Sequence, residues 1–302
     1  MKKLIIPVFL LCGSFMAHSQ LLDVVSMQRL PLPDGYRVDQ ANVSPDGSYA
    51  IISSMTEPGL TKLDLSDGTT TLISSTGSNY DLQFTADSRN IVYRESMTGK
   101  DRLRRVAVKS TDVKTGKTIT LVKPSRNIQA ISVDGMTATA IDGGRRKVKA
   151  LGSDKATGTR PVLSIDHAQL CITTDGRTTV LSPLGTIGKS YIWQSLSPDG
   201  KKIVFCVVGD GCYTCDVDGS NVKSLGILRA PVWYDNNTVV GMVNESDGYV
   251  ITSSEIVASN ADGTVRQTLT APEITATYPS ASKGKISFST PQGELYIINI
   301  NE

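Results

Sequence analysis

A short phrase recurs along this chain: an apolar run, a tight turn containing an aspartate, and a second apolar run. Its clearest copies are residues 196–205 (LSPDGKKIVF) and 43–52 (VSPDGSYAII). Weaker copies occupy residues 84–93, 131–136, 232–240 and 280–288, and the last of these has no aspartate. A phrase that returns every few tens of residues is typical of a repeat architecture. This recurrence constrains the fold more than any other feature of the sequence.

Each copy has the residues of a strand–turn–strand hairpin. Proline presets φ for the turn, aspartate bonds nearby N–H groups, and glycine accepts a positive φ. A second turn signal follows each copy, at residues 67–68, 115–116, 175–176, 218–219, 262–263 and 292–293. Two turns in a repeat imply four strands, and no segment carries the apolar period of a helix. We therefore predict an all-β fold, a six-bladed β-propeller of four-stranded antiparallel blades.

One interval between the turn aspartates is too long. Asp134 and Asp199 are 65 positions apart, whereas the other intervals run from 36 to 47. A propeller blade takes roughly 40 to 50 residues. Residues 143–167 include polar, glycine-rich stretches, so we place an insertion there. A hidden seventh blade is the alternative explanation.

The last repeat stops before its fourth strand. Its third strand, residues 294–299, is followed only by residues 300–302. A ring of blades that does not close leaves exposed strand edges. The apolar stretch 22–30 precedes the first blade, so we expect it to supply the missing strand and to close the ring.

The repeats resemble those of the TolB-like, WD-repeat-like β-propellers. The resemblance rests on residues 197–205, 230–233 and 260–270 and covers nearly the whole chain after residue 19. It implies a six-bladed propeller of a bacterial envelope protein, without the α/β domain that precedes the propeller in TolB. Similar propellers gate prolyl-oligopeptidase-like enzymes and form some pectin-fragment lyases, which depend on several metal-binding histidines.

Residues 1–19 have the pattern of a signal peptide. Lys2 and Lys3 precede an apolar run too short to span a bilayer, and residues 17–19 form a small-residue cleavage site. We expect cleavage after Ser19, a single propeller domain at 20–302 and a periplasmic or secreted protein. A lipoprotein anchored through Cys12 is the alternative.

Charge and composition limit the partners. Removal of residues 1–19 leaves 29 basic and 29 acidic side chains. A nucleic-acid surface needs a basic excess, so no nucleic-acid partner is expected. We also expect no transmembrane segment, no cofactor and a monomer.

Four cysteines remain after position 19, namely Cys171, Cys206, Cys212 and Cys215. A two-residue turn at Asp210-Gly211 would set Cys206 opposite Cys215, which predicts a possible disulfide in an oxidising compartment. Buried free thiols are the alternative. His167 is the one histidine outside the leader. Zinc needs about four ligands, so we predict no metal site.

No catalytic residue emerges, because the chain has no nucleophile elbow and no phosphate-binding loop. Segments that lead into the inner strands should converge on one end of the central channel. The candidate binding residues in those segments are Asp39, Tyr80, Asp81, Arg126, Tyr191, Trp193, Arg229 and Tyr278. Aromatic residues and arginines are frequent hot spots of protein interfaces. The alternative is that these side chains only fill the channel or pack between blades.

We therefore expect a non-catalytic binding or scaffolding propeller of the envelope, which recognises a protein segment or a glycan at the channel entrance. The alternative is a polysaccharide-active hydrolase or lyase that uses acidic residues such as Asp39 and Asp81. Such an enzyme would need two carboxylates about 5 to 10 Å apart.

Overall fold

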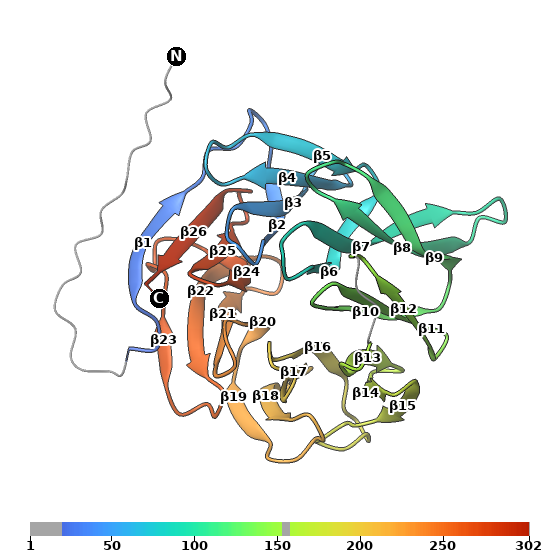
Figure 1. The fold of residues 1–302 in the computed structure, drawn as a ribbon. Coiled ribbons are helices and arrows are strands. Elements are labelled where there is room, and N and C mark those ends of the chain that lie inside the picture. Colours follow the sequence, from blue (N-terminus) through green and yellow to red (C-terminus); the bar gives the residue numbers. More distant parts are fainter. Residues whose placement is uncertain (1–19, 153–157, 302) are drawn as a thin grey trace.

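The computed structural model describes residues 20–152 and 158–301, and all regular structure in this part of the chain is β-strand. The strands form seven antiparallel sheets set around a central axis as the blades of a propeller (Figure 1). Residues 1–19, which contain the expected signal peptide, lie outside the described residues.

Five blades have four strands. From the innermost strand outward they are blade 1, with β2 (Val38–Val43), β3 (Tyr49–Ser54), β4 (Leu60–Asp64) and β5 (Thr70–Ser74); blade 2, with β6 (Gly77–Phe84), β7 (Asn90–Thr98), β8 (Arg104–Asp112) and β9 (Thr118–Ser125); blade 5, with β16 (Tyr191–Leu196), β17 (Lys202–Val207), β18 (Gly211–Asp216) and β19 (Lys223–Gly226); blade 6, with β20 (Arg229–Trp233), β21 (Thr238–Ser246), β22 (Ile251–Asn260) and β23 (Arg266–Thr268); and blade 7, with β24 (Thr277–Ser282), β25 (Lys285–Ser289), β26 (Leu295–Ile300) and β1 (Val24–Arg29).

The other two blades have three strands in the described residues. They are blade 3, with β10 (Ile128–Asp134), β11 (Thr137–Asp142) and β12 (Arg145–Ala150), and blade 4, with β13 (Val162–Asp166), β14 (Gln169–Thr174) and β15 (Arg177–Val180). The prediction of six blades is therefore wrong. The expected insertion at 143–167 is wrong as well, because β12 and β13 lie inside it.

Blade 4 is the blade that the sequence did not predict, because the turn of its first hairpin differs from the recurring phrase. β13 and β14 are joined by His167 and Ala168 alone, whose φ angles are 47° and 63°. Two left-handed residues make a tight hairpin turn without the proline, aspartate and glycine of the recurring phrase. Because blades 3 and 4 are also short, the rest of blade 3 and all of blade 4 fit between Asp134 and Asp199.

The N-terminal strand closes the ring. β1 pairs antiparallel with β26, with Met27 opposite Ile298 and Arg29 opposite Tyr296, so residues 22–30 supply the outer strand of the last blade as expected. Figure 1 shows β1 lying along the outer edge of this blade. Leu22 and Leu30, at the two ends of the closing segment, are buried in the clusters on either side of blade 7. Burial of each leucine contributes about 1.5–3 kcal/mol.

The hydrophobic core is divided into wedges between neighbouring sheets. The wedge between blades 6 and 7 contains Met242, Ile256 and Phe288, and the wedge between blades 4 and 5 contains Tyr191 and Phe205. This arrangement follows from the strand sequences, whose alternate residues are apolar and face the adjacent blade. The wedges hold the inner strands in place around the channel.

The recurring turns also join one blade to the next. The Asp199 carboxylate accepts hydrogen bonds from the Ser197 hydroxyl and the Lys201 N–H, and these bonds lower its pKa. The backbone N–H of Asp199 then donates to the Asn236 side chain in the turn of blade 6, at 2.9 Å. The turn of blade 1 makes the same kind of contact, from the Asp46 N–H to the Ser88 hydroxyl of blade 2. Most turn aspartates thus have a structural role.

One side chain of blade 6 fastens the start of the closing segment. Gln267 accepts hydrogen bonds from the N–H groups of Leu21 and Leu22 and donates one to the Leu22 carbonyl, at 2.8 to 2.9 Å. We predict that Gln267→Ala lowers the free energy of unfolding by about 1–3 kcal/mol, because it leaves the N–H groups of Leu21 and Leu22 without their partner. Urea unfolding followed by circular dichroism measures this.

Gln28→Ala on β1 is the matched control, because Gln28 is exposed and its side chain has no hydrogen bond among the described residues. An equal loss of stability in the two variants would contradict the role given to Gln267.

Candidate binding site at the channel entrance

The seven inner strands form a complete ring around the channel. β2, β6, β10, β13, β16, β20 and β24 each contact the next strand, and β24 contacts β2 (Figure 1). Six of them share a β-bulge near their first residues, and only β13 pairs without one. Bulges re-aim side chains and are frequent next to functional sites. The bulges gather at one end of the channel, which we call the entrance.

Four residues at these bulges have a strained backbone. Asp81, Trp193, Ala230 and Tyr278 have φ angles of 60°, 52°, 46° and 50°. A left-handed conformation costs a residue with a side chain roughly 1–2 kcal/mol, whereas glycine adopts it freely. Trp193 and Tyr278 are nevertheless large and partly exposed. Strain of this kind clusters at binding and catalytic sites.

Hydrogen bonds connect the bulges of blades 6, 7 and 1. Arg229 is paired with Met242, and the Met242 sulfur accepts the N–H of Tyr278 at 3.4 Å. On the other side of Tyr278, Thr277 is paired with Ser289, whose hydroxyl donates to the Asp39 carbonyl at 2.7 Å. Tyr278 therefore lies between Arg229 and Asp39 along the rim of the entrance.

The same connection extends in both directions. Asn79, next to Tyr80, donates to the carbonyl of Gln40, next to Asp39, at 3.1 Å. At the other end, the sulfur of Cys206 contacts the carbonyl oxygen of the residue before Arg229 at 3.7 Å, and Cys206 is paired with the residue before Trp193. Five side chains from consecutive blades thus follow one another around the entrance. We call them the entrance arc, and in order they are Trp193, Arg229, Tyr278, Asp39 and Tyr80.

The side chains of the entrance arc are accessible. Tyr80 is 68% exposed, Trp193 38% and Tyr278 36%. Arg229 is exposed and Asp39 is half-buried, and neither side chain has a hydrogen bond or ion pair within the residues that the structure describes. Burial raises the pKa of the Asp39 carboxyl.

Asp81 is held in a clamp between blades 2 and 3. It accepts hydrogen bonds from Arg94 at 2.9 Å and from the Ile131 N–H at 3.1 Å. Arg94 is buried, also donates to the carbonyls of Ile128 and Gln129, and lies 5.5 Å from the centre of the Tyr80 ring. Burial raises the pKa of Asp81, while the Arg94 charge acts in the opposite direction. Arg94 thus links the Asp81 carboxylate to the Tyr80 ring, and this carboxylate already accepts two hydrogen bonds within the protein.

Besides Asp81, two predicted residues do not join the entrance arc. Tyr191 is fully buried, packs against Phe205 with the two rings tilted, and uses its hydroxyl to bond Leu184 and Gly185. Arg126 is exposed on the link between β9 and β10, outside the series of contacts that joins blades 5, 6, 7, 1 and 2. Arg94 was not predicted, because its contact with Asp81 depends on the bulge and on the position of blade 3.

The disulfide joins Cys206 to Cys212, and the predicted pairing of Cys206 with Cys215 is wrong. The turn between β17 and β18 has three residues, 208–210, rather than two, so Cys206 lies opposite Cys212. Cys215 lies opposite Ile203 on the other face and is a buried free thiol, as is Cys171. Burial raises the pKa of Cys215 to about 12, so it is not a reactive thiolate. Among the described residues no three His, Cys, Asp or Glu side chains are grouped as metal ligands.

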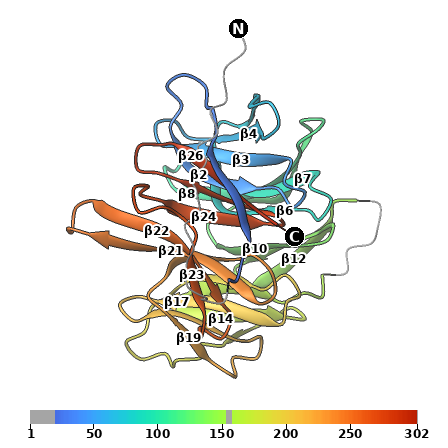
Figure 2. The ribbon, with the colours of Figure 1, turned by 90° about the vertical axis from the view of Figure 1, so that its left-hand side faces the viewer.

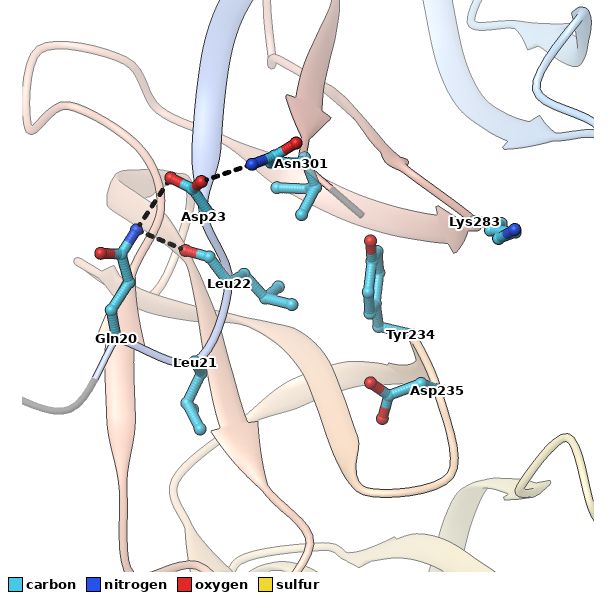
Figure 3. A pocket seen from close by; sticks show the side chains of 9 residues that line it. Gln20, Leu21, Leu22, Asp23, Tyr234, Asp235, Lys283 and Asn301 are labelled. Carbon is cyan, nitrogen blue, oxygen red and sulfur yellow. Dashed lines mark hydrogen bonds between the residues drawn. The ribbon is translucent and has the colours of Figure 1, made fainter.

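A separate hollow lies at the other end of β20, where the first and last described residues come together (Figure 3). It has a volume of about 710 Å³ and is lined by Gln20, Leu21, Leu22, Asp23, Tyr234, Asp235, Lys283, Ile300 and Asn301. Figure 3 shows Asp23 bonded to both Gln20 and Asn301. Sequence reasoning did not find this pocket, because its walls come from four separate segments.

Solved structures provide the comparison for this fold, since no known family model and no curated protein matches the chain. An oligogalacturonate lyase in complex with manganese is 14% identical over 89% of this chain and 79% of its own, with a TM-score of 0.50. TolB from Acinetobacter baumannii is 18% identical over 86% of this chain, with a TM-score of 0.51, and this chain spans 56% of it. A chain of a mitotic checkpoint complex is 9% identical over 97% of this chain and 100% of its own, with a TM-score of 0.60.

These likenesses show the fold alone. The resemblance to TolB-like propellers that the sequence suggested is supported at the level of the β-propeller, with seven blades rather than six. The neighbours include both TolB and a lyase, and one fold can host unrelated functions. The function must therefore be argued from the site.

A substitution of Arg94 tests whether the Asp81 carboxylate stabilises the fold through its ion pair with Arg94. Arg94→Met leaves the half-buried Asp81 carboxylate without its buried counter-charge, which should cost about 3–5 kcal/mol of stability at pH 7. Removal of the arginine raises the pKa of Asp81 further, so the loss should shrink as the pH falls toward 5 and the carboxyl becomes neutral. Chemical unfolding at the two pH values measures both effects.

Arg89→Ala is the matched control, because Arg89 pairs with Asp112 at the surface and such pairs contribute less than about 1 kcal/mol. A loss in Arg94→Met as small as in this control, or one that does not change with pH, would count against the clamp.

Proposed function

We propose that this chain is a non-catalytic binding module of the bacterial envelope, which recognises a protein segment or a glycan at the channel entrance. The entrance arc is the observation that carries the proposal. It presents three accessible aromatic rings and one exposed arginine from separate blades, and Trp193 and Tyr278 retain large side chains at a strained φ. Aromatic and arginine side chains dominate the binding energy of protein interfaces.

An envelope location is part of this proposal. It rests on the signal-peptide pattern of residues 1–19 and is supported by the Cys206–Cys212 disulfide, since disulfides persist mainly in oxidising compartments. Within residues 20–152 and 158–301, the structure has no helix of the length and hydrophobicity needed to cross a bilayer. Intact-mass measurement of the protein from its host separates cleavage before Gln20 from lipidation at Cys12.

A polysaccharide-active hydrolase or lyase is the second candidate. The raised pKa of Asp39 favours it, because a half-buried carboxyl beside a channel can serve as a general acid. The second carboxylate that glycoside hydrolysis requires would have to be Asp81, which is already bonded to Arg94 and Ile131. The geometry therefore supports binding better than catalysis.

Affinity capture from envelope extract tests the proposal. The bait is compared with a Tyr80→Ala/Arg229→Ala/Tyr278→Ala variant, and we expect a specific partner that the variant loses by at least tenfold. The matched control is Tyr249→Ala, since Tyr249 is 95% exposed at the tip of the hairpin between β21 and β22, which projects from the body (Figure 2).

Equal capture by the bait and the triple variant would contradict a site at the entrance. Turnover of a glycan panel that Asp39→Asn or Asp81→Asn abolishes would replace the binding function with the enzymatic one.

A further inference from the structure

Asp39 is the one acidic side chain of the entrance arc, and the protein leaves its charge uncompensated. No described residue donates a hydrogen bond to its carboxylate. The nearest cation along the chain, Arg37, donates instead to the carbonyls of Pro291 and Gln292. Arg94, the cation of the neighbouring blade, is used by Asp81. A half-buried carboxylate without a partner is costly, unless a ligand supplies the missing charge.

The neighbours of Asp39 suit a cationic group. Blades 7 and 2, on either side of it, present Tyr278 and Tyr80, and the hydrogen bonds from Ser289 and Asn79 hold the Asp39 segment between them. Asp39 thus lies on the rim between two blades that each present a tyrosine. A carboxylate binds a cation through an ion pair, and tyrosine rings bind it through their faces. The only cation of the arc, Arg229, lies beyond Tyr278, with all of blade 7 between it and blade 1.

The charge that a ligand brings to Asp39 distinguishes a protein segment from a glycan, the two ligands of the proposed function. A neutral glycan brings no charge to offset Asp39, and an acidic glycan is repelled by it. A lysine or arginine of a protein segment brings the charge on a long apolar stem, which can lie along a tyrosine ring. The remaining polar groups of the segment can then bond Arg229.

We infer that the entrance recognises a basic side chain, lysine or arginine, of an extended partner segment, with Asp39 as its counter-charge and Tyr80 and Tyr278 as its walls. This inference rests on the proposed binding function and deepens it. Arg229 and Trp193 form the adjoining part of the site, where a carbonyl or carboxylate of the same segment binds.

An NMR titration of the labelled protein tests the inference. The probes are Nα-acetyl-lysine methylamide, the uncharged analogue Nα-acetyl-norleucine methylamide, and a trimer of glucosamine as a cationic glycan. We expect the lysine probe to shift resonances of residues 38–40, 79–81 and 277–279, with at least tenfold weaker binding by norleucine. We expect Asp39→Asn to weaken lysine binding by about tenfold or more, since an ionic hydrogen bond is lost.

Two controls keep the result interpretable. Asp39→Asn should fold normally, because the carboxylate makes no bond within the described residues; its raised pKa means that the charged form destabilises the protein at pH 7, so the melting temperature should be unchanged or higher. Tyr249→Ala should bind the lysine probe as the unmodified protein does.

Several outcomes would overturn the inference. They are lysine binding that Asp39→Asn does not weaken, equal binding of norleucine, shifts away from the entrance arc, and tighter binding of the glucosamine trimer. If the capture experiment still shows a partner that depends on the arc, only the inference fails. If capture also fails, the proposed function fails with it.

Discussion

The pairing of β1 with β26 is the constraint on which the rest of the structure depends. Each sheet of a propeller buries its faces against two neighbours, so the first and last blades must be brought together. The chain passes directly from β1, at the outer edge of blade 7, to β2, at the inner edge of blade 1. This connection fastens the two blades whose bulges carry Tyr278 and Asp39. The entrance arc therefore crosses the seam at which the ring closes, and it exists only in the closed ring.

The turn chemistry of the sequence predicted most of the fold. Six of the seven inner hairpins carry an aspartate turn or a remnant of it, and the closing strand follows from the short last repeat. Blade 4 was not predicted, because His167 and Ala168 make its first turn without any residue typical of the recurring phrase. The disulfide was misassigned because the turn lies at 208–210 rather than at 210–211, so Cys206 pairs with Cys212, three positions before Cys215. A shift by an odd number of positions moves every side chain of a strand to the opposite face.

The candidate site was predicted in part. The convergence of the inner strands identified Trp193, Arg229, Tyr278, Asp39 and Tyr80, because it depends only on where those strands begin. It could not separate Tyr191 from Trp193, since Trp193 lies in the bulge between Ile192 and Ser195 whereas Tyr191 lies before it, and this decides which side chain is buried. Nor could it identify Arg94 as the partner of Asp81, which requires the relative position of two blades. The start of a strand can be predicted from nearby residues, whereas a contact between blades depends on residues far apart in the sequence.

The central claim is that the entrance arc, rather than the hollow of Figure 3, is the binding surface. Hydrogen–deuterium exchange with and without the captured partner tests it most directly. The account predicts slower exchange in residues 38–43, 78–84, 191–196, 229–233 and 277–282, and no change in residues 162–166 of β13, which has no bulge. Protection confined to residues 20–23 and 283–285, around the hollow of Figure 3, would contradict the account.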